Sequence, residues 1–409
     1  MAAAVISVFG SAYAAESAEE EKYTLGEISG YAVSSAGLKT TDKYDDGKFY
    51  ASVEAETKAC NKAFTLIIAQ YDGDSKLLKI SAKKQSVYDT KETLTSSLTL
   101  EDDSTGGFVK VFVWDDSVKP LAETYSMKER YSLDGFEDAV VYFPGYRLKA
   151  VTFSFDDCLP NDTRLMSILD KYNLIGTFNL QTSKFYGKDE ATRQTVFNRY
   201  NTHHEIASHS RTHPKSTDVL NMTVDAVAQE IADSLADIKD LFGIVPKGLA
   251  WPGKAPSSHS DYDKILEWLS DNGIKYARDS WYTYNYKMPS DWLKWNAACS
   301  AKKLQDYTQD FLNLDTEGEL VMLSSWGHAS DFTSEDMWTA FDEACASFKD
   351  RDDVWKASNI DICLYDLGVK KLSVDALNGT ITNAGDVELY IEIDGIRGLI
   401  PANTVIKFK

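Results

Sequence analysis

From about residue 147 onward, short apolar runs alternate with segments of helical periodicity, and few architectures accommodate this alternation. The apolar runs read AVTFSF, IGTFNL, HEIAS, KGLAW, IKYA and LVMLSS. Alternating strand and helix patterns are typical of an α/β fold, in which helices cover a parallel sheet. About six or seven units fit between residues 147 and 370, which favours an open or distorted (β/α)7-type barrel over a complete eightfold one.

The clearest helix signal in this region is MTVDAVAQEIADSLADIKDLFG. Its apolar positions are spaced by four, four, three and four residues, so they share one helix face: Val227, Ile231, Leu235, Ile238 and Phe242. Gly243 follows and predicts the end of the helix. The runs DTRLMSILDKYN and SEDMWTAFDEACASF predict two further helices.

β-Rich segments flank the alternating region on both sides. Residues 22–127 contain FTLIIAQYD, KLLKISAKK, SLTLEDD and VKVFVWDD between turn-forming residues, which predicts a β-sandwich accessory domain. The charged residues 128–146 are interpreted as a linker. Residues 371–409 return to a β pattern and predict a small C-terminal β extension, with a hairpin turn at Asp394-Gly395.

The first 21 residues have the character of a leader rather than of a domain. An apolar run is followed by Ala12-Tyr13-Ala14, which resembles the cleavage site of a secretory signal peptide without its basic start. We therefore expect a secreted protein, extracellular or associated with the cell surface; the alternative is an Ala-rich terminus. No later segment has the ~18 apolar residues of a membrane helix, so a transmembrane protein is not expected.

The strongly negative net charge of the chain argues against partners that are themselves negatively charged. The 409 residues carry a formal net charge of -20, which repels nucleic acid and anionic lipid and makes both poor candidates. The five cysteines are odd in number and contain no CxxC pair, which excludes a disulfide framework and a thiolate zinc site. The sequence does not indicate an oligomeric state.

Chemically active residue types follow four of the predicted strands. VTFSF leads into Asp156 and Asp157, HEIAS into His209 and His213, KGLAW into Pro252-Gly253, and LVMLSSWG into His328. Because parallel α/β folds collect their reactive groups at the carboxyl ends of strands, these residues are expected to converge. The simpler alternative is that each is a polar residue closing a strand.

Asp157, His209 and His213 are the candidate metal ligands. Side chains alternate along a strand, so adjacent Asp156 and Asp157 are expected to point in different directions, one toward a metal and one toward the reacting centre. One carboxylate and two imidazoles suit Zn²⁺, with Co²⁺, Ni²⁺ and Mn²⁺ as alternatives. The i, i+4 histidines are expected to face the same way over one helical turn, with Pro214 disfavouring helix at His213.

Taken together, TFSFDD, HEIASHSRTH, AWPG and LSSWGH resemble, in order and spacing, the motifs of the polysaccharide deacetylases. These are proteins of NodB-homology fold, carbohydrate esterase family 4. The resemblance covers about residues 147 to 370. It implies a distorted (β/α) barrel of about seven strands and metal-dependent removal of acetyl groups from a polysaccharide or oligosaccharide.

The resemblance also assigns roles to residues. Asp157, His209 and His213 match the metal triad, and Asp156 matches the catalytic base. His328 matches the histidine that acts as general acid, and Gly253 matches the position whose backbone N–H helps to hold the oxyanion. His204 and Glu205 match the lead-in of the histidine motif and are interpreted as structural support.

This sequence departs from the family pattern at three positions. Cys158 stands where a glycine usually follows the acid pair, and it is interpreted as a small buried residue rather than a further metal ligand. Ala250 replaces the arginine that holds the catalytic acid; Arg278, at the end of IKYA, is either its replacement from a neighbouring strand or a surface arginine. Lys254 stands where the family often has glycine.

Two tryptophans next to the motifs, Trp251 and Trp326, are candidate walls for a sugar ring, although tryptophans at such positions also pack in cores. Three functions remain open from the sequence. The first is a secreted, metal-dependent carbohydrate deacetylase acting on N- or O-linked acetyl groups. The second is a non-catalytic carbohydrate-binding protein with the same fold, and the third is another C–N amidohydrolase.

Overall fold

The structure is a computed structural model that describes residues 23–44, 47–101, 106–115, 121–122, 125–127, 129–130 and 136–408. The predicted leader, residues 1–21, and residues 128 and 131–135 of the predicted linker lie outside these ranges. The chain divides into two compact units, Met1–Ser132 and Leu133–Lys409, and each is described by itself.

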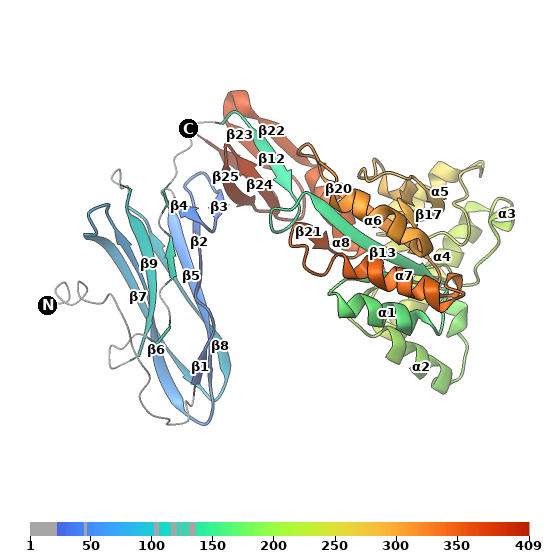
Figure 1. The fold of residues 1–409 in the computed structure, drawn as a ribbon, viewed down its shortest axis with the longest axis horizontal. Helices are drawn as coiled ribbons and strands as arrows, with labels where there is room; N and C mark the ends of the chain where they lie inside the picture. Colours follow the sequence, from blue (N-terminus) through green and yellow to red (C-terminus); the bar gives the residue numbers. More distant parts are fainter. Residues whose placement is uncertain are drawn as a thin grey trace. The chain divides into compact units, whose positions relative to one another are not determined.

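The first unit consists of β-strands in its described residues (Figure 1). One antiparallel group has the order β1-β5-β2-β3, with β8 also paired to β5, and a second has the order β10-β9-β6-β7. The strands are β1 (Tyr23–Leu25), β2 (Ser29–Val33), β3 (Lys39–Thr40), β4 (Lys43–Tyr44), β5 (Lys48–Thr57), β6 (Asn61–Tyr71), β7 (Leu77–Tyr88), β8 (Lys91–Thr99), β9 (Phe108–Trp114), β10 (Tyr125–Met127) and β11 (Glu129–Arg130).

Alternating sequence explains the core of this unit. Every second residue of β5 and β9 is buried, and the apolar ones among them join one cluster with alternate residues of β6: Phe64, Leu66 and Ile68. Phe49, Phe64 and Val111 are completely buried members. Period-2 alternation places such side chains on one face of each strand, which is what two sheets sharing a core require.

The second unit is built on a parallel sheet, as the strand and helix alternation predicts. Its order is β18-β17-β16-β15-β14-β13-β20-β19, with β21 also paired to β13. The strands are β13 (Lys149–Asp156), β14 (Gly176–Leu180), β15 (Glu205–Ser208), β16 (Gly248–Ala250), β17 (Tyr276–Tyr282), β18 (Trp295–Ala297), β19 (Cys299–Ser300), β20 (Val321–Gly327) and β21 (Val354–Lys356).

The run from Trp295 to Ser300 connects the two ends of this strand order. Its first part, β18, pairs with β17, and its last part, β19, pairs with β20. Between them, the Ala298 N–H donates to the Ser324 carbonyl at 2.9 Å. The parallel pairings therefore return through β20 to β13, where they began.

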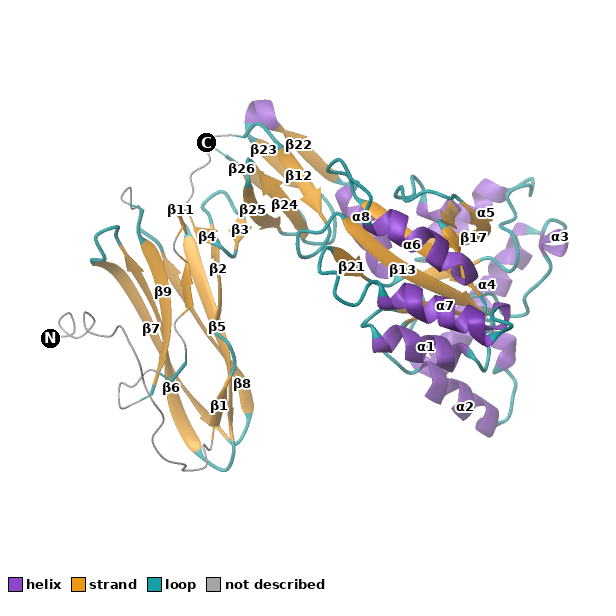
Figure 2. Cartoon of the chain, viewed as in Figure 1, coloured by secondary structure: helices purple, strands orange, loops and turns teal. Residues whose placement is uncertain are grey.

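Helices lie around these strands (Figure 2). They are α1 (Asp162–Lys171), α2 (Glu190–Tyr200), α3 (Ser216–Val219), α4 (Val224–Phe242), α5 (Tyr262–Asp271), α6 (Leu304–Leu312), α7 (Glu335–Ala346) and α8 (Asn359–Val369). The three helices predicted from periodicity are confirmed as α1, α4 and α7. Helix α4 begins after Thr223, whose side chain accepts the Ala226 N–H, and ends at Gly243 in the left-handed conformation.

Strand β13 separates the apolar core from the polar interior. Phe153 and Phe155 are completely buried, and both pack edge-on against Phe341 of α7. The alternate residues, Ser154 and Asp156, belong to the opposite face, where they join a polar network. The alternation along one strand thus directs apolar side chains to the helices and polar ones to the interior.

The predicted C-terminal hairpin is confirmed. β24 (Leu389–Ile393) and β25 (Ile396–Ile400) are antiparallel, and Asp394 and Gly395 between them both have positive φ, as a tight hairpin turn requires. Strand β12 (Ala139–Tyr142) pairs with β24, so the predicted linker 128–146 is wrong for these residues. The remaining strands β22 (Leu372–Asp375), β23 (Thr380–Asn383) and β26 (Thr404–Lys407) form an antiparallel sheet.

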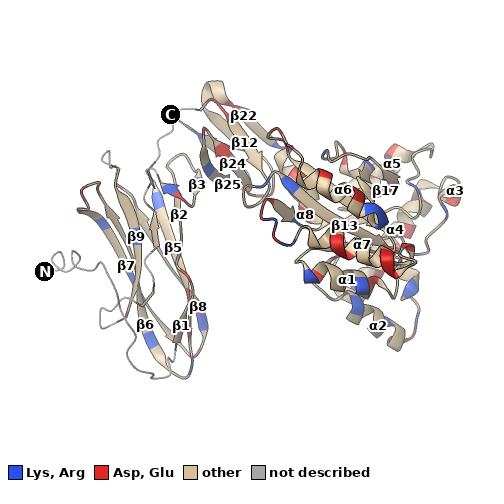
Figure 3. Ribbon diagram, in the orientation of Figure 1, with Lys and Arg blue, Asp and Glu red and all other residues tan. Residues whose placement is uncertain are grey.

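Acidic residues are distributed over the second unit and include positions in α6 and α7 (Figure 3). Within the described residues, no helix combines the length and the apolar character needed to cross a membrane.

Candidate metal and catalytic site

The carboxyl ends of β13, β15 and β20 and an interior position of β17 bring the candidate residues together. Asp156 ends β13 and Asp157 follows it, while His209 follows β15 directly. Arg278 lies within β17, and His328 follows β20. These five residues are joined by the contacts described below, so the predicted convergence of strand ends is observed.

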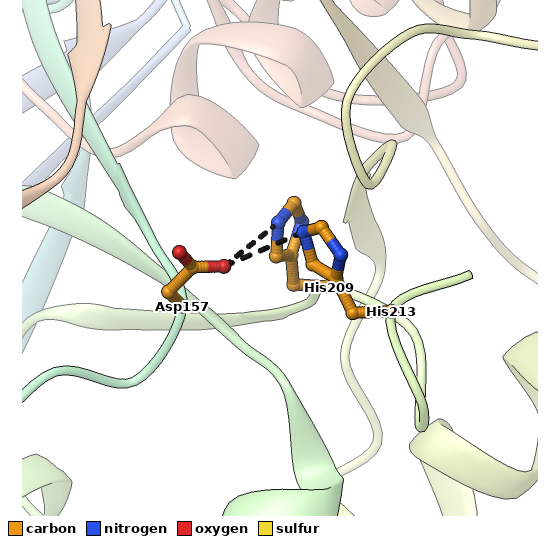
Figure 4. A group of neighbouring side chains, drawn as sticks. All are labelled: Asp157, His209 and His213. Atoms are coloured by element: carbon orange, nitrogen blue, oxygen red, sulfur yellow. Dashed lines mark ion pairs between the residues drawn. The ribbon is translucent and has the colours of Figure 1, made fainter. Parts of the chain in front are cut away.

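Asp157, His209 and His213 form a cluster whose potential ligand atoms all lie within 4.8 Å of one another. Asp157 Oδ1 is 3.4 Å from His209 Nε2 and 3.5 Å from His213 Nε2 (Figure 4). Asp157 has φ +82, a left-handed conformation that is costly for a residue with a side chain. This backbone turn directs Asp157 to both histidines, while the Asp156 carboxylate is bound to Arg278 and reaches only His209, with Oδ2 4.0 Å from Nε2.

The hydrogen bonding of this cluster fits a bound cation. His209 Nδ1 lies 2.8 Å from the Ala250 carbonyl oxygen, which can only accept, so the proton is on Nδ1 and Nε2 presents a lone pair. That lone pair faces Asp157 Oδ1, a buried oxygen without a hydrogen-bond partner in the described part of the chain. Two acceptors facing each other in a buried place favour a positive ion between them.

The ionisation of Asp157 is consistent with a ligand role. A protonated His209 ring holds the pKa of the Asp157 carboxyl at about 2, against the opposing effect of burial, and a cation bound in the same place would lower it in the same direction. The carboxylate is therefore charged at neutral pH and available to a metal ion without loss of a proton.

A loop, and not a helical turn, brings the two histidines together, so that part of the prediction is wrong. Ser210 and His213 both have left-handed backbone, with φ +60 and +58. The His213 N–H donates to Ser210 Oγ at 3.1 Å, and Arg211 between them donates to two aspartates of α4, Asp233 and Asp237. Sequence reasoning assigned no role to Arg211, although it lies inside the HSRTH motif.

Asp156 is enclosed and paired with Arg278. Both side chains are almost completely buried, and Arg278 Nη2 lies 2.6 Å from each oxygen of the Asp156 carboxylate. Asn179 donates to Asp156 Oδ1 at 2.8 Å, and Arg278 Nε donates to Ser154 Oγ at 3.1 Å. Burial alone would raise the pKa of Asp156, but the charge of Arg278 dominates the groups that hold it below its ordinary value.

The register of β16 and β17 explains how Arg278 can stand in for the arginine missing at Ala250. The two residues are direct partners in the parallel pairing of these strands. Partners on adjacent strands lie ~5 Å apart and point to the same face. The open question from the sequence is thereby answered geometrically: Arg278 is buried against Asp156 and is not a surface arginine.

His328 approaches the cluster from the carboxyl end of β20, which pairs with β13 on the side away from β14. Its Nε2 is 3.7 Å from Asp157 Oδ2, and its Nδ1 is 3.2 Å from Asp331 Oδ2. Burial lowers the pKa of His328, but the bond to Asp331 and the nearby carboxylates outweigh it, so the pKa is raised. Sequence reasoning missed Asp331; its signal is the capping-box spacing of His328 and Asp331 around one short helical turn, Ala329–Asp331.

Gly253 lies in the loop after β16 at φ +74. A Cβ atom added there would lie 2.6 Å from Ser216 Oγ, and that hydroxyl accepts the Lys254 N–H at 2.8 Å. The left-handed conformation and this close approach both require glycine. The loop is thereby held against the segment that follows His213.

The two candidate sugar-binding tryptophans have different environments. Trp251 is 3% exposed and packs in an apolar cluster with Leu249 and Ile231, so it offers no open ring face and its predicted role as a sugar wall is wrong. Trp326 is half-buried at the site, with the Arg278 guanidinium 4.4 Å from its ring centre and the His328 ring 5.6 Å away.

Another potential metal-binding group, Asp170, His203 and His204, fits a cation poorly. The Gly176 N–H donates to His204 Nδ1 at 3.3 Å, so the proton of the neutral ring is on Nε2, the atom that faces Asp170. A protonated nitrogen cannot be a ligand. Cys158 is 4% exposed within the apolar core, in agreement with its interpretation as a buried residue.

Residues 146–277 match the family model described as polysaccharide deacetylase. These residues belong to the polysaccharide deacetylase family. Its members are hydrolases, the carbohydrate esterases. The matched range includes Asp156, Asp157, His209 and His213 and ends one residue before Arg278. The resemblance inferred from the motifs is therefore confirmed for this domain.

Solved structures that are similar to this chain include the following three. A Mycobacterium smegmatis protein provisionally named a polysaccharide deacetylase has 18% identity and a TM-score of 0.43, covering 58% of this chain and 96% of its own. The Puue allantoinase has 12% identity and a TM-score of 0.42, and the match covers 54% of this chain and 91% of the allantoinase chain. A third structure is a family 4 acetyl xylan esterase from Clostridium thermocellum in complex with a cobalt ion. It has 18% identity and a TM-score of 0.36, and the match covers 54% of this chain and 92% of the esterase chain.

Identities and TM-scores of this size do not assign an activity to this chain. No curated protein matches the sequence significantly.

Proposed function

We propose that this deacetylase is a secreted, metal-dependent enzyme that hydrolyses acetyl groups from a polysaccharide or oligosaccharide. The observation that carries the proposal is the pair of adjacent acids in different environments. Asp156 is buried and ionised against Arg278, while Asp157 faces His209 and His213. One acid is thus suited to proton transfer and the other to metal binding.

Asp157, His209 and His213 would hold the ion, with Zn²⁺ as the first choice and Co²⁺, Ni²⁺ or Mn²⁺ as alternatives. A divalent ion at that position supplies Lewis acidity, which polarises an acetyl carbonyl and lowers the pKa of water. The His209 ring is fixed for this role by its bond to the Ala250 carbonyl.

The remaining residues would move protons and hold developing charge. Asp156 accepts the proton of the attacking water, since Arg278 and Asn179 keep its carboxylate ionised and oriented. His328 protonates the leaving nitrogen or oxygen, and its raised pKa favours the charged imidazolium that this step needs. The Gly253 N–H is the proposed donor to the oxyanion.

The finer architecture is also part of the proposal. The parallel strands would form the distorted (β/α)7-type barrel of the family, supported by pairings that return to β13. The first unit would be a β-sandwich accessory domain, and the last strands a C-terminal β extension. Export rests on the sequence Ala12-Tyr13-Ala14 in the predicted leader.

The test is acetate release by the metal-loaded protein from acetylated xylan, chito-oligosaccharides and peptidoglycan. We expect release from at least one, lost on chelation and in Asp156→Asn, because both remove a required group. Asp263→Asn, at a side chain 96% exposed, is the matched control and should retain full activity. No release from any substrate by metal-loaded protein would refute the deacetylase proposal for these glycans and favour a binding role or another amide substrate.

A further inference from the structure

A row of aromatic side chains leads away from His328. The Trp326 ring centre is 5.6 Å from that of His328, and the Tyr282 ring stacks on Trp326 at 5.7 Å with an angle of 22°. The Tyr284 ring follows, 5.9 Å from Tyr282. Exposure rises to 67% at Tyr284, so the row runs from the partly buried His328 to the surface.

The chain holds the outermost ring in place at an energetic cost. Tyr284 has φ +54, a conformation that glycine or asparagine adopts more readily than a bulky residue. Its N–H donates to the Ala298 carbonyl at 3.1 Å, and the Thr283 N–H donates to the Ala297 carbonyl at 2.9 Å, so the backbone is tied to the neighbouring strand. A strained backbone that presents an exposed ring has no evident folding advantage, and strain of this kind gathers at binding sites.

Trp326 and Tyr284 differ in what is open to a ligand. The Arg278 guanidinium lies 4.4 Å from the centre of the Trp326 ring, and the Tyr282 ring stacks on the same ring. The protein's own side chains therefore already contact the Trp326 ring. Tyr284 is in contact with Tyr282 alone among the aromatic rings recorded for the described residues. The accessible end of the row is therefore Tyr284, with the partly exposed Tyr282 beside it.

We propose that Tyr284 and Tyr282 form a subsite for a sugar unit adjacent to the one that loses its acetyl group. The inference rests on the proposed function: His328 must reach the leaving nitrogen or oxygen, which is attached to a sugar ring, so that ring lies beside His328 and the next ring reaches the aromatic row. Pyranose rings have apolar C–H faces and polar rims, which suit tyrosine faces and hydroxyls. The substrate is thus an oligosaccharide or polysaccharide of at least two units.

The test compares substrate length. Acetate release would be measured on N-acetylglucosamine oligomers and acetylated xylo-oligosaccharides of one to five units. For whichever series is hydrolysed, kcat/KM of the wild-type protein should rise about tenfold once a second or third unit is present, the gain expected of one aromatic contact. Tyr284→Asn removes the ring without adding backbone strain, and it should abolish that rise while leaving the single-unit substrate unchanged.

Two variants make the result specific. Tyr284→Phe keeps the ring and should retain the dependence on length. Tyr88→Asn removes a tyrosine of similar exposure, 69%, from the first unit and should have no effect. A loss in Tyr284→Asn that is equal on substrates of every length, or no loss at all, would overturn the subsite.

A binding measurement separates this inference from the proposed function. The chelator-treated full chain would be titrated calorimetrically with the five-unit oligomers. Affinity that falls about tenfold in Tyr284→Asn, without acetate release from any substrate by metal-loaded protein, would support the subsite and refute the deacetylase. Acetate release without any dependence on Tyr284 in rate or affinity would do the reverse.

Discussion

Replacing Arg278 by methionine should raise the pKa of Asp156 and move the acidic limb of the pH–rate profile upward. Asp156 is 2% exposed, and after the substitution only the Asn179 amide among its two hydrogen-bonding side chains would remain. An opposite charge within ~4–6 Å lowers a carboxyl pKa by about 1–3. Removal of the guanidinium should therefore move the midpoint of the acidic limb to a pH higher by about 1–3 or more. At a fixed pH on this limb, kcat/KM should fall about tenfold each time the pKa of Asp156 rises by one.

The same substitution should be costly to the fold. Removing one partner of a buried ion pair costs about 3–5 kcal/mol, because the other charge remains buried. The pKa of Asp156 is lowered in the folded state, so the contribution of the pair is present above the ordinary carboxyl pKa and is lost as the pH falls through the folded-state value. Denaturant unfolding should therefore be measured at pH 7, where the pair is fully ionised.

A double-mutant cycle decides whether the pair acts as a unit. Arg278→Met, Asp156→Asn and the double variant would be unfolded in guanidinium chloride, and the double variant should be less destabilised than the sum of the singles by roughly 2 kcal/mol or more. Arg278→Lys keeps the charge and should move the acidic limb less than Arg278→Met. Additive losses in the cycle, or an unmoved limb in Arg278→Met, would refute the reasoning.

The register of the sheet supplies a stricter version of this experiment. Ala250 pairs directly with Arg278, so the variant Ala250→Arg/Arg278→Ala moves the guanidinium to the neighbouring strand at the same level. We expect it to return the acidic limb toward its wild-type position. The single variant Arg278→Ala is the matched control and should keep the limb at its raised position.

Three further substitutions test other parts of the site. His213→Ala should weaken zinc affinity by at least about 100-fold in calorimetric titration, since it removes one of three ligands. Asp331→Asn should lower the pKa of His328, because it removes the carboxylate that raises this pKa. Since His328 is active while protonated, the alkaline limb of the pH–rate profile should move to lower pH. An unmoved limb would contradict the role of Asp331. Gly253→Ala should destabilise the fold by roughly 1–2 kcal/mol, because residue 253 has a positive φ and an added Cβ would approach Ser216 Oγ. Adding Ser216→Ala to this variant should relieve only the part of the loss that comes from the contact with Ser216.

The strands of the second unit were predictable where apolar runs are long. AVTFSF and LVMLSS correspond to β13 and β20, since five or more apolar or small residues in a row indicate a buried parallel strand. The run from Trp295 to Ser300 was not predicted. Its two paired pieces, β18 and β19, have three and two residues, and their strand character comes from the partners on either side rather than from a local pattern.

The sequence predicted those residues of the candidate site that lie at the ends of strands. Asp156, Asp157, His209 and His328 each follow an apolar run directly, and a parallel sheet necessarily collects such positions at one edge. The tryptophans were not predictable in this way. Trp251 and Trp326 both adjoin motifs, but only the packing around each ring decides that one is enclosed and the other reaches the site.

By itself, the sequence determined the parallel α/β class, the C-terminal end of α4, the C-terminal hairpin and the candidate metal triad, because periodicity, capping residues and strand ends are local signals. The tertiary structure alone decided that Arg278 serves Asp156 from 122 residues away, that Asp331 holds His328, and that left-handed turns rather than a helix join His209 to His213. These outcomes depend on strand register and on contacts between distant segments, and a local pattern carries no information about either.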